Sequence, residues 1–166
     1  MSKYAIEIKD LVKTFDSFKL GPVNLTIPKG TIVGYIGQNG AGKSTLIKMM
    51  TGILMPSEGS ISVNGFTPSK REEKFKKSIG LMMGNRSSLI YDLPVRDSFE
   101  YLKIIYDVDN GKYNDALVLL EKINAIELLD IPVRKLSLGQ RKKMELVSTI
   151  LHNPKILFLD EATIGM

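Results

Sequence analysis

The sequence contains no cysteine among its 166 residues. This absence excludes both a disulfide framework and a thiolate metal site, and it permits an intracellular location. The chain also lacks any apolar run of the roughly 18 residues that a membrane-spanning helix needs. Its first residues, Met1 to Ile8, alternate as a β-strand does and lack the apolar core of a signal peptide. We therefore expect any connection to a membrane to run through a partner protein.

Composition and charge are those of an ordinary globular domain. Hydrophobic residues make up 43% of the chain and charged residues 25%, and the formal net charge is +5. A basic balance is compatible with nucleic acid, an anionic membrane surface or an anionic ligand. The densest basic stretch, Lys70 to Lys77, mixes acidic residues among the basic ones at helical spacing. It holds one arginine, Arg71, and one aromatic residue, Phe75, without the repeated interleaving of the two that is typical of nucleic-acid platforms, so we expect a solvated helix face and no nucleic acid.

The first half of the chain reads mainly as strands. Short β-type runs at residues 4–8, 11–15 and 23–27 each end in a charged residue, glycine or proline, which predicts an antiparallel layer. The continuous apolar run from Thr31 to Ile36 is typical of a buried parallel strand. A helix is expected from Lys43 to about Thr51, followed by strands at residues 59–65 and 79–83.

Helical periodicity replaces the β-type runs from Pro94 to about Ile150. It predicts two apolar faces, formed by Phe99, Leu102, Ile105 and Tyr106 and by Ala116, Leu119, Leu120 and Ile123. A second buried strand is then expected over residues 155–159. These patterns predict an α/β fold in a single domain of 166 residues, with residues 1–84 and 153–166 as the core and residues 85–152 as a helical subdomain.

A glycine-rich loop with the spacing G-x-x-x-x-G-K-S follows the expected strand and precedes the expected helix. Glycines allow a tight turn that presents backbone N–H groups to phosphate oxygens. Lys43 reaches the β- and γ-phosphates, and the Ser44 hydroxyl is a ligand for Mg²⁺. The alternative of a glycine-rich turn without chemistry fits this context poorly. The expected ATP-binding residues of the loop are Gly37, Asn39, Gly40, Ala41, Gly42, Lys43, Ser44 and Thr45.

Two acidic residues end the second apolar strand. Asp160 suits a Mg²⁺ ligand that acts through water, as in other P-loop proteins. Glu161 faces the other side of the chain and is expected to be the general base that activates the attacking water. The alternative is an ordinary polar strand terminus. The phosphate loop upstream favours the metal-binding and catalytic interpretation.

The run Leu136-Ser137-Leu138-Gly139-Gln140 precedes a helix that leads to Asp160. Here the chain resembles the nucleotide-binding domain of ATP-binding cassette (ABC) transporters, whose signature usually reads LSGGQ. The resemblance implies a P-loop NTPase core with an antiparallel β layer and a helical subdomain. It also implies that Ser137, Gly139 and Gln140 contact the γ-phosphate held by an opposite subunit. By itself, Ser137 is also a plausible helix N-cap.

Other family positions follow from the same resemblance. Phe15 lies where the family stacks an aromatic ring on adenine, although it also suits the core of an edge strand. Residues 84–94 correspond to the glutamine loop but contain no glutamine, and Asn85 is the aligned candidate for contact with nucleotide and Mg²⁺. Further departures are Leu138 for glycine and Ala162 for proline. His152 is expected to end the signature helix and to have no catalytic role.

The resemblance implies an ATPase, with Lys43 and Glu161 as its catalytic residues, that energises export through a separate transmembrane permease. It further implies a homodimer or cassette heterodimer on the inner face of the cell membrane. Alternatives are a cassette ATPase that acts on ribosomes or DNA, and an ATP-binding fragment without turnover. The match stops at Met166, before further family elements, so we also expect a C-terminally incomplete fold of lower stability and impaired turnover.

Overall fold

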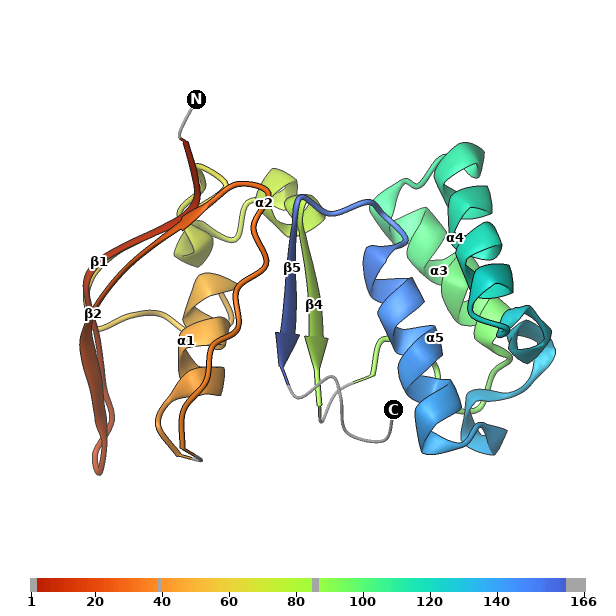
Figure 1. Ribbon diagram of the computed structural model, residues 1–166, viewed down its shortest axis with the longest axis horizontal. Helices are drawn as coiled ribbons and strands as arrows, with labels where there is room; N and C mark the ends of the chain where they lie inside the picture. The colour runs from red at the N-terminus through yellow and green to blue at the C-terminus, as the bar shows by residue number, and fades with distance from the viewer. Residues whose placement is uncertain (1–2, 39, 85–86, 161–166) are drawn as a thin grey trace. The chain divides into compact units, whose positions relative to one another are not determined.

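A computed structural model of the chain describes residues 3–38, 40–84 and 87–160. These residues fall into two units that divide between Ile79 and Gly80, and both are drawn in Figure 1. The antiparallel layer lies in the first unit, and the helical region lies in the second. No helix in the described ranges is both long enough and apolar enough to cross a bilayer.

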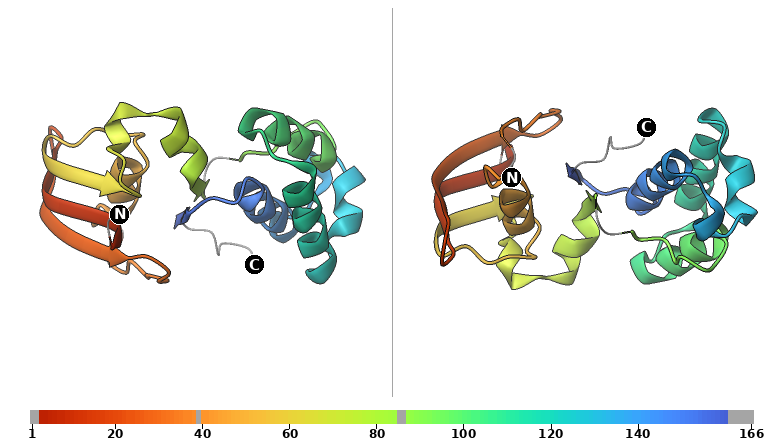
Figure 2. Two further views of the ribbon diagram at one scale, coloured as in Figure 1. Left: turned by 90° about the horizontal axis from the view of Figure 1, so that it is seen from above. Right: turned by 90° about the horizontal axis from the view of Figure 1, so that it is seen from below.

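The first unit is built on an antiparallel sheet of three strands in the order β2-β1-β3. Strand β1 spans Tyr4–Thr14, β2 spans Lys19–Pro28 and β3 spans Glu58–Val63. Helix α1, Lys43–Met50, packs against one face of this sheet (Figure 2). Alternate strand residues are buried on that face because successive side chains of a strand point to opposite sides. The predicted antiparallel layer and the helix after the loop are confirmed.

The runs at residues 4–8 and 11–15, predicted as two strands, form the single strand β1 with a bulge at Asp10. Asp10 has a left-handed φ of 47°, and the register with β2 shifts between Ile8 and Leu11. The Asn24 side chain satisfies the bulge, because its oxygen accepts the Asp10 N–H at 2.9 Å and its nitrogen donates to Asp10 Oδ1 at 3.0 Å. These bonds replace ladder bonds, so the strand continues through the irregularity.

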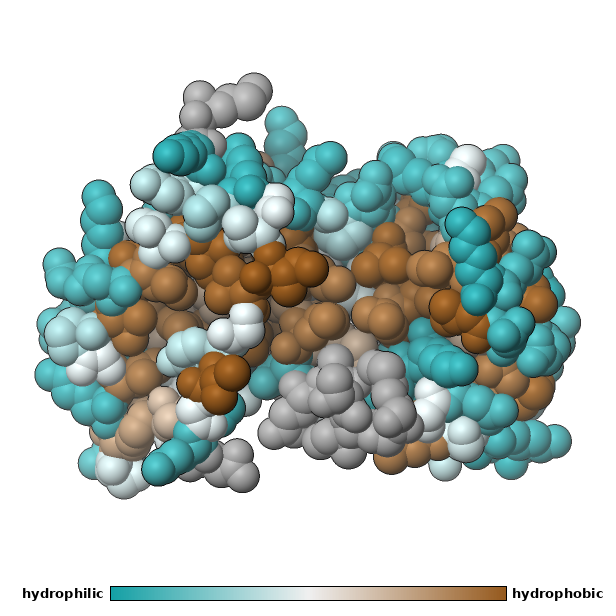
Figure 3. All heavy atoms as spheres, viewed as in Figure 1, coloured by the Kyte–Doolittle hydropathy of each residue, from teal (hydrophilic) through white to brown (hydrophobic). Residues whose placement is uncertain are grey.

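The prediction of a buried strand from Thr31 to Ile36 is wrong. The described residues 31–38 have no regular structure, and Ile36 is 94% exposed. A buried strand needs a neighbouring strand to take up its backbone hydrogen bonds. The sheets formed by the described residues contain no strand beside this segment. Hydrophobic side chains are correspondingly visible on the surface of this unit in Figure 3.

The basic stretch after β3 forms a solvated surface, as predicted. It contains the 3-10 turn η1, Pro68–Lys70, and the short helix α2, Glu73–Ser78. Phe75 is fully buried, whereas Lys74 and Lys76 are exposed. The helix therefore has one apolar contact and an otherwise charged outer face.

The second unit contains the strand β4, Ile79–Met83, apart from its first residue, and the strand β5, Ile156–Asp160, and these two strands pair with each other. Their arrows point the same way in Figure 1, so the pair is parallel. Parallel neighbours need a long crossover, and the helical region supplies it. The expected strand at 155–159 is confirmed, but Leu157 is 40% exposed and Leu159 45% exposed. The strand is thus only partly buried.

The crossover consists of helices α3, Val95–Tyr106, α4, Asn110–Lys122, and α5, Leu138–Ile150. The 3-10 turns η2, Ile126–Asp130, and η3, Val133–Lys135, join α4 to α5. These elements share one hydrophobic cluster, in which the fully buried residues include Phe99, Leu120 and Met144. The predicted helical region is confirmed.

One assignment of a helix face is wrong in this region. Ile105 was expected beside Phe99 but is 48% exposed, whereas Ser98 is fully buried. The Ser98 hydroxyl accepts the N–H of Ile90 at 2.9 Å, and this hydrogen bond compensates for the burial of a polar group.

Two left-handed glycines provide a test of the sheet geometry. Gly59 has φ of +79° and Gly65 has φ of +81°, so alanine strains the backbone at both positions. A Cβ at Gly59 would also meet the Asp10 carbonyl oxygen, whereas a Cβ at Gly65 meets nothing within 4 Å. We expect Gly59→Ala to lower the free energy of unfolding by about 1–3 kcal/mol more than Gly65→Ala. Urea denaturation of both variants measures the difference. Equal losses of unfolding free energy would contradict the close approach of Gly59 to the Asp10 carbonyl.

Candidate functional site

The phosphate loop turns through glycines in the left-handed region. Gly40 has φ of +82° and Gly42 has φ of +88°. A Cβ at Gly42 would lie 2.9 Å from Leu20 Cδ1 and would displace that side chain, and the left-handed backbone favours glycine at this position. Gly42 is also the N-cap of α1, which begins at Lys43 as the sequence predicted.

The Lys43 side chain folds back over the loop. Its Nζ donates to the carbonyl oxygen of Gly37 at 2.6 Å and to that of Gln38 at 2.7 Å. Two neutral oxygens thus occupy two of the three donors of a charged ammonium group. Phosphate oxygens are stronger, charge-assisted acceptors for the same donors. The position of Lys43 therefore suits an exchange of loop carbonyls for phosphate.

The start of α1 also suits an anion. Within the described residues no side chain caps this helix, and its first turn carries no acidic residue. Backbone N–H groups at a helix start attract negative charge. Ser44 and Thr45 lie in this first turn and are half-buried, and the Ala41 N–H donates to the Gln38 carbonyl at 3.2 Å. The loop residues fit a nucleotide phosphate; Asn39, also predicted here, lies outside the described residues.

The β1–β2 hairpin of the same unit carries a pair of aromatic rings. Phe15 and Phe18 stack with centroids 6.3 Å apart, and they are 40% and 39% exposed. Lys13 Nζ lies 5.4 Å from the centre of the Phe15 ring. The exposure of Phe15 suits a ring that stacks on a base better than a core residue. Phe18 was missed in the sequence, although two phenylalanines flanking a short turn were a usable signal.

The signature segment starts α5 with a capping box. Ser137 Oγ accepts the Gln140 N–H at 3.2 Å, and Gln140 Oε1 accepts the Ser137 N–H at 2.9 Å. The predicted N-cap is therefore confirmed. Both side chains are exposed, Gly139 is half-buried and Leu138 is 48% exposed. Because Ser137 Oγ only accepts in this box, its O–H remains able to donate to an anion.

Asp160 is the last residue of β5 and is half-buried. It belongs to the second unit, as do Ser137 and Gln140, whereas Ser44 and the rest of the phosphate loop belong to the first. Glu161 and Asn85 lie outside the described residues. In the part of the chain that is described, no three histidine or acidic side chains gather as metal ligands do.

His152 lies just beyond the end of α5 at Ile150, as the sequence predicted. Its ring stacks on Tyr106 with centroids 4.2 Å apart and 14° between the planes. This stacking joins the end of α5 to the end of α3 and accounts for the residue by packing.

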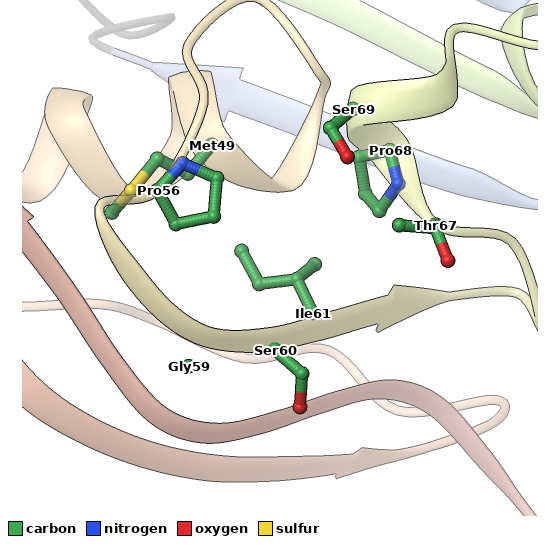
Figure 4. A pocket seen from close by; sticks show the side chains of 8 residues that line it. All are labelled: Met49, Pro56, Gly59, Ser60, Ile61, Thr67, Pro68 and Ser69. Atoms are coloured by element: carbon green, nitrogen blue, oxygen red, sulfur yellow. The ribbon is translucent and has the colours of Figure 1, made fainter.

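One small pocket lies between α1, β3 and η1 (Figure 4). Its volume is about 160 Å³, and its lining includes Met49, Ile61 and Pro68. It contains no charged residue and no residue of the phosphate loop. This pocket is too small and too neutral for a nucleotide.

The chain matches known proteins over most of its length. A family model described as ABC transporter matches residues 20–164. The ABC transporter ATP-binding protein NatA of Bacillus subtilis (strain 168) is 32% identical over 87% of this chain. The ABC transporter ATP-binding protein YybJ of the same organism, described as uncharacterized, is 34% identical over 95% of this chain. The chain spans 59% of the length of NatA and 71% of the length of YybJ.

Solved structures give the same result for the fold. An ATP-binding subunit of an ABC transporter superposes with a TM-score of 0.85 at 27% identity, over 97% of this chain and 68% of that one. The cbiO1 protein of Clostridium perfringens, described as part of the ABC transporter complex cbiONQ, superposes with a TM-score of 0.82 at 26% identity. That match covers 99% of this chain and 68% of cbiO1.

The capping box separates the two possible roles of Ser137. Ser137→Ala removes the acceptor for the Gln140 N–H and is expected to lower the free energy of unfolding by about 1 kcal/mol. Ser137→Asp retains an equally good cap and is expected to keep wild-type stability while losing the donor for phosphate. Thermal unfolding compares both variants. If Ser137→Asp lowered the free energy of unfolding as much as Ser137→Ala does, Ser137 would not stabilise the protein by capping α5.

Proposed function

Because this chain belongs to the ABC transporter family of ATP-binding proteins, we propose that it binds and hydrolyses Mg–ATP to energise export through a separate transmembrane partner. The observation that carries the proposal is the phosphate loop, in which Lys43 lies on two loop carbonyls at the open start of α1. The name of one relative supports a role in transport: the lantibiotic transport ATP-binding protein SrtF of Streptococcus pyogenes is 31% identical over 97% of this chain.

ATP would be held mainly by the first unit. Lys43 would exchange the carbonyls of Gly37 and Gln38 for the β- and γ-phosphate oxygens, and N–H groups at the start of α1 would complete the phosphate site. Phe15 would stack on the adenine. These contacts use one charged group and several backbone dipoles for the phosphates and one aromatic ring for the adenine.

Hydrolysis would need further residues. Ser44 and Asp160 would hold Mg²⁺, with Asn85 as a further contact. The ion, when bound, neutralises charge on the phosphates. Glu161 would accept a proton from the attacking water, which makes it the general base. Lys43 would stabilise the charge that develops on the transferred phosphoryl group.

The signature segment would act on a second copy of the domain. Ser137 would donate its free O–H to a γ-phosphate held by the facing copy, with Gly139 and Gln140 beside it. Two domains would then enclose two ATP molecules, on the inner face of the membrane beside the permease. Closure of the pair on ATP and its opening after hydrolysis would move the permease.

Turnover is tested with the chain and its transmembrane partner reconstituted in lipid vesicles. We expect Lys43→Met to lose ATP binding, whereas Lys48→Met in the last turn of the same helix should bind normally. Glu161→Gln should bind ATP but hydrolyse it at least about 100-fold more slowly, because the general base is lost. Phosphate release and equilibrium binding are the measurements. Tight binding without hydrolysis by the wild type would favour an ATP-binding chain without turnover.

The aromatic pair gives a separate prediction for base recognition. Phe15→Leu should weaken ATP binding about 3- to 10-fold because a stacking ring is lost, while Phe15→Tyr should bind as the wild type does. Phe18→Leu should have a smaller effect, because Phe18 supports the first ring. Isothermal titration with ATP measures all three variants. If Phe15→Leu binds normally, the ring does not contact the base.

A further inference from the structure

Two charged side chains of α5 are almost completely buried. Lys142 and Glu145 are each 3% exposed, and Lys142 Nζ lies 3.0 Å from Glu145 Oε2. They lie five and eight residues after Ser137 on the helix that this serine caps. An apolar pair of similar size is often as stabilising as a buried ion pair, or more so, because charges lose their hydration on burial. Stability alone therefore gives little reason for charges at these positions.

The pair is connected to strand β4. Lys142 Nζ donates to the carbonyl of Gly84, the residue after the end of β4, at 3.4 Å. A second hydrogen bond, between Ser148 Oγ and Ser88 Oγ at 2.7 Å, lies one helical turn further along α5. The same polar face of the helix therefore holds the chain on both sides of a short segment that follows β4.

The other end of β4 contacts α5 as well. A Cβ at Gly80 would lie 2.8 Å from the carbonyl oxygen of Thr149, so the helix backbone approaches this strand more closely than a side chain permits. Contacts near Lys142 and near Thr149 fix the helix along the strand. Lys142 and Glu145 lie on the same helix, so the rotation of α5 is limited by the hydrogen bonds from Lys142 to Gly84 and between Ser148 and Ser88, and Glu145 holds Lys142 Nζ in place for the first of them. Strand β4 pairs with β5, which ends at Asp160.

We propose that Lys142 and Glu145 are positioning residues for ATP turnover: their buried ion pair, joined to the Gly84 carbonyl, fixes the start of α5 at Ser137 relative to the β4–β5 pair that carries Asp160. The inference rests on the proposed ATPase function. Neither residue touches the nucleotide in this proposal. A small rotation of α5 would displace the Ser137 hydroxyl, and so reduce turnover, while ATP bound by the phosphate loop remains bound.

The test replaces both charges at once, so that neither member of the pair is left buried without the other. Arg141, whose Nε lies 3.7 Å from Glu145 Oε1, also loses a partner, but its side chain is 35% exposed to solvent. Lys142→Met/Glu145→Met is prepared in the full chain and reconstituted with the transmembrane partner, together with Lys142→Arg, which keeps the charge. The matched control is Lys103→Met/Glu100→Met. It removes a pair of the same residue types at the same spacing, 3.7 Å apart and more exposed, from α3. Melting temperature, ATP affinity, turnover and hydrogen exchange of residues 137–145 are measured.

We expect the buried double variant to melt near the wild-type temperature and to bind ATP normally. Its kcat should fall at least 10-fold with little change in KM, and residues 137–145 should exchange faster. Lys142→Arg should retain most of the wild-type kcat. The kcat of the control variant should stay within twofold of the wild-type value. Wild-type kcat or unchanged exchange in the buried double variant would overturn the inference. A wild-type chain without turnover would instead refute the proposed function, and the exchange comparison would still decide whether the pair positions α5.

Discussion

A left-handed backbone at Gly42, with φ of +88° and Leu20 Cδ1 against the position of a Cβ, turns the chain from the loop into α1. Because the helix begins at the next residue, the Lys43 side chain reaches back to the carbonyls of Gly37 and Gln38. The same turn leaves the first N–H groups of α1 directed at the loop. A positive side chain and a positive helix end thus meet at one place, and the phosphate recognition that we propose for the first unit depends on that coincidence.

The second helix start works differently, although both suit an anion. At α5 the Ser137 and Gln140 side chains satisfy each other's backbone N–H groups, so less of the helix end remains for a ligand. Ser137 keeps one hydroxyl donor. A single exposed donor makes a weaker contact than the glycine loop does, which suits the proposed role as a contact that forms and breaks in each cycle. The phosphate loop would bind ATP throughout the cycle, and Ser137 would contact it only while the domain pair is closed.

A buried polar face ties α5 to the strand pair of the second unit. Apolar packing holds Met144 and Val147 in the cluster but tolerates small rotations of a helix. The Lys142–Gly84 and Ser148–Ser88 hydrogen bonds reach from α5 to residues outside it and are directional, so they restrict the rotation of the helix, and Glu145 holds Lys142 in place. The orientation of the Ser137 hydroxyl is consequently coupled to strand β4 through groups that contribute little to net stability. This division between packing and orientation is the physical basis of the positioning role we propose.

The sequence by itself determined the features that depend on neighbours a few residues apart. The spacing from Gly37 to Ser44, the cap at Ser137 and the alternation in β1 predicted the loop, the helix start and the antiparallel layer. Only the tertiary structure decided which surfaces are covered. Ile36 is exposed because no described strand lies beside it, and Lys142 is buried because α5 packs its polar face toward Gly84. Turns and caps are closed by local hydrogen bonds, whereas burial depends on elements far away in the chain.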